Sequence, residues 1–348
     1  MFAEDDKMEI IHGHCGFCAL PDAYHCVADI TRPIPLSHSS VNDFLTCHYL
    51  FYLKKALGIS RRPEHFSEAL KAGVLWETVK QKHIGANPKL SIKEAIEQYQ
   101  MQEITVVKVR ALYHAYKELE IVVEDGFETQ AKIDMVHNIT LPASSFIPSI
   151  SIGAESINLW SDRKDQEEDA RSWTFPLHVI GFYDRKYPTY FAEDKLSSRP
   201  EYYLDPFYIQ SQNGTYFLAD PNLEYCIQEV AQFPMQRELK NETSLDQLYQ
   251  RTYDEILSRP SKYFIGYDNK KRMYGKKFYR GEFNLDAIVK KYQQVCIEIL
   301  AAQWSGNFYR NYKSCNNVLP GISCDFQDIC KTNNVSETLY ATRKKAAL

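Results

Sequence analysis

Residues 178–196 read HVIGFYDRKYPTYFAEDKL and give the clearest structural signal in this sequence. Two apolar runs, 178–187 and 190–196, are separated by Pro188 and Thr189. Apolar runs joined by so short a turn predict two strands paired as a β-hairpin.

The predicted hairpin gathers acidic side chains and one lysine. Because side chains alternate along a strand, Glu193 and Lys195 should share one face while Asp194 points to the other. Pairing of the two strands can bring Asp184 beside them. Two such carboxylates suit Mg²⁺ or Mn²⁺, and a lysine nearby can orient a water or neutralise developing charge. The alternative is a surface hairpin with ordinary charges.

The segments around the hairpin alternate between helical and strand-like spacing. Residues 119–140 have a period of two, which predicts strands or a hairpin around Glu124-Asp125-Gly126. Apolar residues elsewhere recur at helical spacing, and Ser39 or Ser40 can cap the first helix. The expected helices lie at about 39–58, 67–83, 91–118 with a break near its middle, 207–232, 245–258 and 284–305.

Composition limits the class of protein. The chain has 348 residues, and its 44% hydrophobic content excludes a wholly disordered protein. No apolar run approaches the ~18 residues of a membrane span, and the acidic start lacks the apolar core of a secretory signal. We therefore expect no membrane association and a cytoplasmic location, or the host cytoplasm if the source is a virus. A net charge of -4 excludes a wholly basic nucleic-acid coat but leaves room for a local basic groove.

Three residues of the hairpin carry a resemblance to a known family. Asp184, followed by Glu193-x-Lys195 across a hairpin, resembles the core motif of the PD-(D/E)XK nucleases, in their RecB-like branch. Gln212 and Tyr216, spaced Gln-x3-Tyr on the next predicted segment, resemble the Gln/Tyr motif of that branch.

One upstream position departs from the family pattern. Residues 73–77 read GVLWE where the family usually shows Gly-x3-His, so Glu77 replaces the histidine. Glutamate supplies an oxygen ligand for the same cation, and activity can survive the exchange. The alternative is that the exchange marks a catalytically inactive module that grips DNA in a recombination or replication complex.

The resemblance implies a fold and a reaction. The implied fold is α/β, with a three-layer restriction-endonuclease-like core, a mixed central sheet, and helical N- and C-terminal segments wrapped around it. The implied activity is metal-dependent hydrolysis of DNA, exonucleolytic on single-stranded ends, in recombination, repair or replication beside a helicase or recombination protein. The implied roles are metal ligation by Asp184, Glu193 and Glu77, orientation of the attacking water by Lys195, and support of the site by Gln212 and Tyr216.

Three late cysteines form a second candidate site. Cys315, Cys324 and Cys330 are spaced Cys-x8-Cys-x5-Cys, and Cys47 is the best candidate for a fourth ligand. Iron–sulfur members of the RecB-like nucleases, including the AddB nuclease domain and the CRISPR-associated exonucleases, similarly place one cysteine before the core and three after it. The resemblance implies that these four hold a [4Fe–4S] cluster with a structural role. Four thiolates also fit zinc, which would suit a zinc-stapled structural protein.

A further group of cysteines and histidines lies near the N-terminus. Cys15 and Cys18 form Cys-x2-Cys, a common half of a zinc site, and Cys26, His25 or one of His12 and His14 can complete it. The alternative is a flexible arm with reduced thiols. We expect three parts: a Cys/His-rich arm over 1–35, a nuclease domain over 36–331 and a polar tail over 332–348.

Residues 262–280 read KYFIGYDNKKRMYGKKFYR, in which cations and aromatic residues are interleaved. Cations can follow a phosphate backbone while aromatic rings stack on unpaired bases. The alternative is an ordinary solvated face. The residues predicted to contact single-stranded DNA are Lys270, Lys271, Arg272, Tyr274, Lys276, Lys277 and Arg280.

Overall fold

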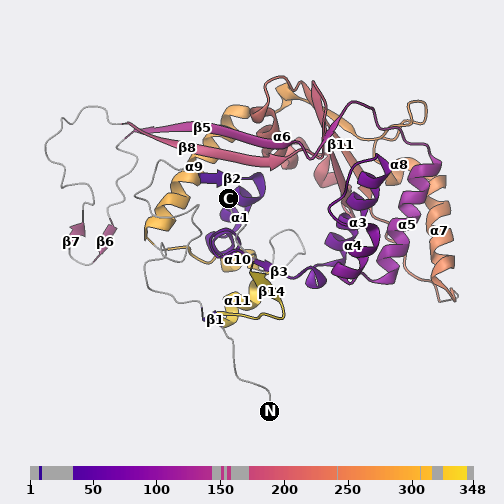
Figure 1. The fold of residues 1–348 in the computed structure, drawn as a ribbon, viewed down its shortest axis with the longest axis horizontal. Helices are drawn as coiled ribbons and strands as arrows, with labels where there is room; N and C mark the ends of the chain where they lie inside the picture. The colour runs from indigo at the N-terminus through magenta and orange to yellow at the C-terminus, as the bar shows by residue number, and fades with distance from the viewer. Residues whose placement is uncertain are drawn as a thin grey trace, which may run out of the picture.

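The protein is described by a computed structural model. The described residues are 8–9, 34–142, 150–152, 155–157, 172–240, 242–305, 307–315 and 324–342. Within them the chain forms eleven α-helices and a mixed α/β arrangement (Figure 1).

The central sheet has five strands in the order β12-β11-β10-β9-β4. Strands β10 and β11 are parallel, and the other neighbours are antiparallel, so the sheet is mixed. The strands are β4 (Glu128–Thr129), β9 (Arg185–Lys186), β10 (Tyr190–Ser197), β11 (Tyr225–Gln232) and β12 (Lys276–Tyr279).

A long two-stranded ribbon extends from one end of this sheet, as Figure 1 shows. It consists of β5 (Lys132–Pro142) and β8 (Ser172–Phe182), with β2 (Ile34–Leu36) parallel to β8. The Tyr183 amide donates to the Ala131 carbonyl at 3.0 Å, and β4 and β9 continue the pairing beyond. Gln130 at this junction has a left-handed φ of 54°. The chain therefore bends between β8 and β9, where Asp184 lies.

The predicted hairpin is present in a short form. The Tyr187 amide donates to the Tyr190 carbonyl at 2.8 Å and closes the turn at Pro188 and Thr189. Only two residue pairs join β9 to β10, because the bend at Asp184 carries β8 into the ribbon instead.

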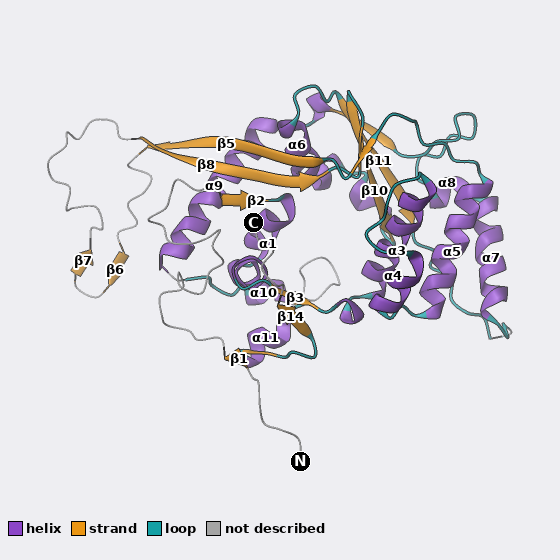
Figure 2. Ribbon diagram, viewed as in Figure 1, coloured by secondary structure: helices purple, strands orange, loops and turns teal. Residues whose placement is uncertain are grey.

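Helices cover both faces of the central sheet (Figure 2). One set comprises α1 (His38–Thr46), α6 (Pro206–Ala219) and α9 (Leu285–Ser305), and its core includes Phe191 and Phe217. The other set comprises α3 (Glu68–His83), α4 (Ile92–Tyr99), α5 (Glu103–Glu118), α7 (Leu245–Ser258) and α8 (Pro260–Tyr263). Trp76, Tyr116 and Phe264 pack in the second core.

Several predicted helices are confirmed. The Ser67 hydroxyl caps α3 by accepting from the Leu70 amide at 3.3 Å. The expected break within 91–118 occurs at Gln100, whose φ of 46° ends α4 in the left-handed region. Residues 245–258 form α7 as expected.

Other expectations for the secondary structure are wrong. The segment 207–232 is not one helix, because α6 ends at Ala219 and residues 225–232 form β11. A parallel strand covered on both faces is apolar on both faces, so it lacks the alternation that marks a strand. The first helix is capped by Ser37 and is interrupted at Cys47, after which α2 (His48–Phe51) and a π-helix (Tyr52–Ala56) follow. Residues 121–123 are not a strand.

The late part of the chain packs against the early part. Helices α10 (Tyr312–Cys315) and α11 (Gln327–Thr332) lead into β13 (Asn334–Val335), which pairs with β1 (Met8–Glu9). Strand β14 (Tyr340–Thr342) pairs with β3 (Ile59–Arg61). The segment expected as a polar tail from residue 332 thus contains two short strands, β13 and β14, up to residue 342. Strands β6 (Ile150–Ile152) and β7 (Glu155–Ile157) pair with each other.

None of the helices in the described residues has both the length and the apolar character that a membrane span requires.

Candidate active site and cysteine pocket

The bend between β8 and β9 and the middle of β10 bring three predicted site residues together. The Lys195 Nζ lies 2.8 Å from the Glu193 Oε2 and 3.6 Å from the Asp184 Oδ2. The Asp194 amide donates to the Asp184 Oδ2 at 2.9 Å, which fixes the Asp184 carboxylate against β10. Two carboxylates and one ammonium group thus meet on one face of the sheet.

Helix α6 adds the two predicted residues of the Gln-x3-Tyr pair. The Gln212 Nε2 donates to the Glu193 Oε2 at 2.8 Å and lies 3.0 Å from the Tyr216 hydroxyl. The Tyr183 hydroxyl donates to the Tyr216 carbonyl at 2.9 Å and ties α6 to the bend. One oxygen of Glu193 therefore accepts from both Lys195 and Gln212.

Burial controls the electrostatics of Glu193, whose side chain is 1% exposed. Burial raises the pKa of Glu193, the charge of Asp184 adds to the increase and Lys195 opposes both, so that this pKa is about 8. Burial alone would lower the pKa of Lys195, but the charges of Glu193 and Asp184 outweigh it and raise that pKa. Lys195 therefore stays an ammonium group, while Glu193 holds its proton more tightly than an ordinary glutamate.

Glu77 lies on α3 at the edge of this group. Its exposed side chain accepts from the Gln81 Nε2 at 2.9 Å. Partial desolvation raises the pKa of Glu77, and the nearby charge of Asp184 adds to the increase. The structure thus places Glu77 within electrostatic reach of Asp184 but does not join the two in a hydrogen bond.

The donor set can be compared with the needs of a divalent cation. Among the described residues, no three His, Cys, Asp or Glu side chains are grouped closely enough to hold a metal ion by themselves. Mg²⁺ commonly takes only one or two carboxylates and keeps several waters. Asp184 and Glu193, whose mutual repulsion a cation would relieve, fit that requirement.

The opposite face of β10 carries a buried network of charges that the sequence analysis missed. The Lys80 Nζ contacts Asp194 and lies 2.8 Å from the Glu229 Oε2 and 3.0 Å from the Tyr274 hydroxyl. The Arg185 Nη2 lies 2.7 Å from the same Glu229 oxygen. Lys80 and Arg185 are both 2% exposed, and their charges lower the pKa of Asp194 against the opposing effect of burial. The network joins α3 to β9, β10 and β11 behind the candidate site.

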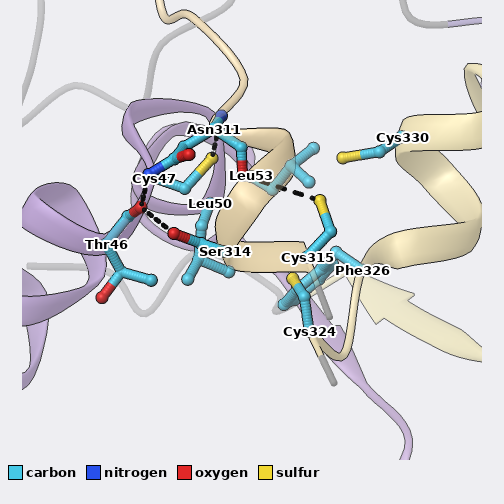
Figure 3. Close-up of a pocket in the computed structure, with 10 residues that line it drawn as sticks. All are labelled: Thr46, Cys47, Leu50, Leu53, Asn311, Ser314, Cys315, Cys324, Phe326 and Cys330. Carbon is cyan, nitrogen blue, oxygen red and sulfur yellow. Dashed lines mark hydrogen bonds between the residues drawn. The ribbon is translucent and has the colours of Figure 1, made fainter. Parts of the chain in front are cut away.

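The four predicted cysteines line one pocket, although they come from distant parts of the chain. Figure 3 shows Cys47, Cys315, Cys324 and Cys330 around it. Leu50, Leu53 and Phe326 supply apolar walls, and Thr46, Asn311 and Ser314 complete the lining.

Hydrogen bonds hold the two sides of this pocket together. The Ser314 hydroxyl and the Asn311 Nδ2 both donate to the Thr46 carbonyl at 3.0 Å. The backbone amide of Asn311 donates to the Cys47 Sγ at 3.3 Å. Backbone donors of this kind stabilise negative charge on sulfur, as a thiolate ligand requires.

The thiols repel one another when they ionise. Burial raises the pKa of Cys330 to about 12, and the charges of Cys315, Cys324 and Cys47 contribute to the increase. Burial likewise raises the pKa of Cys324 to about 11. The raised pKa values of Cys324 and Cys330 show that a thiolate there lacks sufficient compensating positive charge, which a bound cationic metal centre would supply.

The N-terminal candidates Cys15, Cys18, His25 and Cys26 lie outside the described residues.

The basic stretch is only partly exposed. Tyr274 is 4% exposed and packs in the second core, so its assignment as a DNA contact is wrong. Arg280 donates to the carbonyls of Phe217 at 2.6 Å and Asp220 at 3.1 Å, which gives it a structural role instead.

The other predicted DNA contacts in this stretch are exposed. Arg272 pairs with Glu120, and the Lys277 Nζ lies 3.3 Å from the centre of the Tyr225 ring. The Lys276 Nζ donates to the Leu204 carbonyl at 3.1 Å. The backbone amides of Lys270 and Lys271 donate hydrogen bonds to the Asp268 carboxylate in a turn.

No protein-family model matches this sequence, and no curated protein matches it. The function is therefore inferred from the geometry of the site.

Proposed function

We propose that this protein is a divalent-metal-dependent deoxyribonuclease of the PD-(D/E)XK type, in its RecB-like branch, that degrades single-stranded DNA from an end. One observation carries the proposal: the Lys195 ammonium lies 2.8 Å from the buried Glu193 carboxylate and 3.6 Å from Asp184. Hydrolysis of a phosphodiester needs cation ligands and a positioned positive group, and these three residues supply both kinds.

Each residue of the site has its own proposed role in hydrolysis. Asp184 and Glu193 would hold Mg²⁺ or Mn²⁺, with Glu77 available at the edge. Such a cation, when bound, polarises a phosphodiester and lowers the pKa of a coordinated water. Lys195 is placed to orient the attacking water and to offset the charge that develops on phosphate. The Gln212 Nε2 donates to the Glu193 Oε2 at 2.8 Å and so holds this carboxyl group in position.

The surroundings of the site support a restriction-endonuclease-like core. A mixed sheet lies between two sets of helices, Asp184 directly precedes β9, Glu193 lies on the paired strand β10, and the Gln-x3-Tyr helix follows them. The cysteine pocket supports a structural iron–sulfur cluster. Four cysteines line this pocket, but among the described residues no three ligand-type side chains are grouped closely enough for a single ion such as zinc, which needs each sulfur at about 2.3 Å.

The test is cleavage of end-labelled single-stranded DNA by anaerobically purified protein with Mn²⁺ or Mg²⁺. We expect the wild type to cut and Lys195→Ala to lose at least ~10²-fold in rate, as for other charge-stabilising groups. Lys93→Ala is the matched control, because Lys93 is 83% exposed on α4.

The remaining outcomes discriminate between the alternatives. Equal cutting by Lys195→Ala and the wild type would place the activity outside this site. Tight DNA binding without any cutting would favour the inactive DNA-binding module, and restoration of cutting by Glu77→His would assign that loss to the exchanged ligand.

A further inference from the structure

A second cationic group lies beside the candidate active site. The Lys291 Nζ on α9 donates to the Ser211 hydroxyl at 2.9 Å and lies 3.5 Å from the Asn42 Oδ1. Ser211 directly precedes Gln212, which contacts Glu193. Lys291 therefore lies where α1, α6 and α9 meet, next to the catalytic face of β10.

No carboxylate pairs with Lys291 among the described residues. Its hydrogen-bond partners are a hydroxyl and an amide, and burial lowers the pKa of Lys291 with no charged neighbour offsetting it. Removing an ammonium group from water without an anion costs free energy. Two buried or half-buried lysines nearby are paired instead, Lys195 with Glu193 and Lys80 with Glu229.

His38 extends this group toward the active site. The His38 Nε2 lies 2.9 Å from the Asn42 Nδ2. Burial lowers the pKa of His38 to about 4, and the charges of Lys291 and Lys195 add to that effect. When Nε2 accepts from Asn42, a neutral ring carries its proton on Nδ1, which gives a neutral donor within electrostatic reach of Lys291 and Lys195.

We propose that Lys291, Ser211 and His38 form a subsite for a phosphate group of the nucleic-acid strand, adjacent to the phosphate that is cut. The subsite combines one unpaired ammonium, a hydroxyl and an imidazole N–H, which are donors suited to a phosphate. It deepens the proposed nuclease function, because a neighbouring phosphate held here would fix the strand relative to Lys195. The phosphate can be an internal diester or a terminal monoester, since both present the same oxygens.

The test measures binding, so that it does not depend on catalysis. Fluorescence anisotropy of a labelled single-stranded oligonucleotide is recorded in Ca²⁺ over a range of salt concentrations. We expect Lys291→Gln to weaken binding about tenfold, as for loss of a hydrogen bond to a charged group. The slope of log K against log salt should fall in magnitude by about 0.7, the value for one phosphate contact with a single strand.

Two controls make the result specific. Lys93→Gln removes the same charge from an exposed site and should leave binding within about twofold of the wild type. Lys291→Arg keeps the charge and should retain most of the affinity. If Lys291→Gln fails to fold, as judged by thermal melting, Ser211→Ala replaces it and should also weaken binding.

The outcomes separate this subsite from the proposed reaction. Loss of affinity in Lys291→Gln supports the subsite even if the wild type does not cut DNA. Unchanged affinity and salt slope overturn the subsite even if cutting is normal, as does a wild type that binds no single-stranded DNA. Oligonucleotides with a 5′-phosphate or a 5′-hydroxyl identify the source: an effect of Lys291→Gln confined to the former indicates a terminal phosphate, and an effect on both indicates an internal one.

Discussion

Glu193 and Asp194 are consecutive residues of β10, and their carboxyl groups have pKa values shifted in opposite directions. Burial and the charge of Asp184 raise the pKa of Glu193, whereas Lys80 and Arg185 lower the pKa of Asp194 against the effect of burial. Because side chains alternate along a strand, the Glu193 carboxyl group faces the candidate active site. The Asp194 carboxylate faces the other way, into the network where lysine and arginine charges balance it.

Substitutions at these two positions should therefore differ in their effect on stability. Glu193→Gln removes a poorly compensated buried charge, and at pH 8 we expect the free energy of unfolding to be unchanged or higher. Asp194→Asn leaves Lys80 and Arg185 buried with one anion fewer. We expect it to lower the free energy of unfolding by about 3–5 kcal/mol. Urea unfolding followed by circular dichroism measures both. Equal destabilisation by the two variants would contradict the assignment of the two faces.

The pH dependence of stability should report on Glu193. Its pKa in the folded protein is about 8, above its ordinary value of 4.5, so the folded state binds this proton more tightly than the unfolded state. The contribution is fully present below pH 4.5 and is lost as the pH rises toward 8.

The measurement is the free energy of unfolding of the wild type minus that of Glu193→Gln across pH 5 to 8. We expect this difference to fall with rising pH, and millimolar Mg²⁺ should reduce the fall by replacing the proton. A difference that rises with pH would show that Glu193 is ionised and well compensated in the folded state.

The cysteine pocket predicts a selective loss of metal. Cys330→Ala and Cys47→Ala should lose iron and the visible absorption of the cluster after anaerobic purification. Cys296→Ala is the matched control, because Cys296 is a buried cysteine of α9, at 2% exposure, in the core of the first helix set and away from the pocket. Elemental analysis that finds zinc without iron in the wild type would replace the cluster with a zinc site.

Glu77 should affect the metal requirement more than the fold. Its side chain is exposed and contacts Gln81, so Glu77→Ala should change the free energy of unfolding by less than about 0.5 kcal/mol. We expect the Mn²⁺ concentration for half-maximal cutting to increase severalfold in Glu77→Ala and to be recovered in Glu77→His. An unchanged Mn²⁺ requirement in Glu77→Ala would remove Glu77 from the site.

The local part of the site could be predicted because it depends on short spacings. Strand alternation places Glu193 and Lys195 on one face, and the helical spacing of Gln212 and Tyr216 lets both side chains meet. These relationships need only a correct assignment of the strand and the helix.

The remainder depends on tertiary contacts that have no local signal. Lys80 and Lys291 look like ordinary helix lysines in the sequence, yet one is buried among carboxylates and the other faces a serine on another helix. Tyr274 belongs to a stretch that resembles a basic surface, but the Lys80 ammonium and the second core bury it. Residues 225–232 were missed as a strand because both of their faces are covered.

The contact between Thr46 and Ser314 spans 268 positions and has a consequence for synthesis of the chain. The residues within 46–53 that line one side of the cysteine pocket leave the ribosome long before those within 311–330 that line the other side are synthesised. Loop closure over such a distance is slow, so this pocket is among the last regions to close. A nascent chain stopped before residue 315 would present Cys47 without its partners, so a metal centre held by all four cysteines would form only after translation of the late segment.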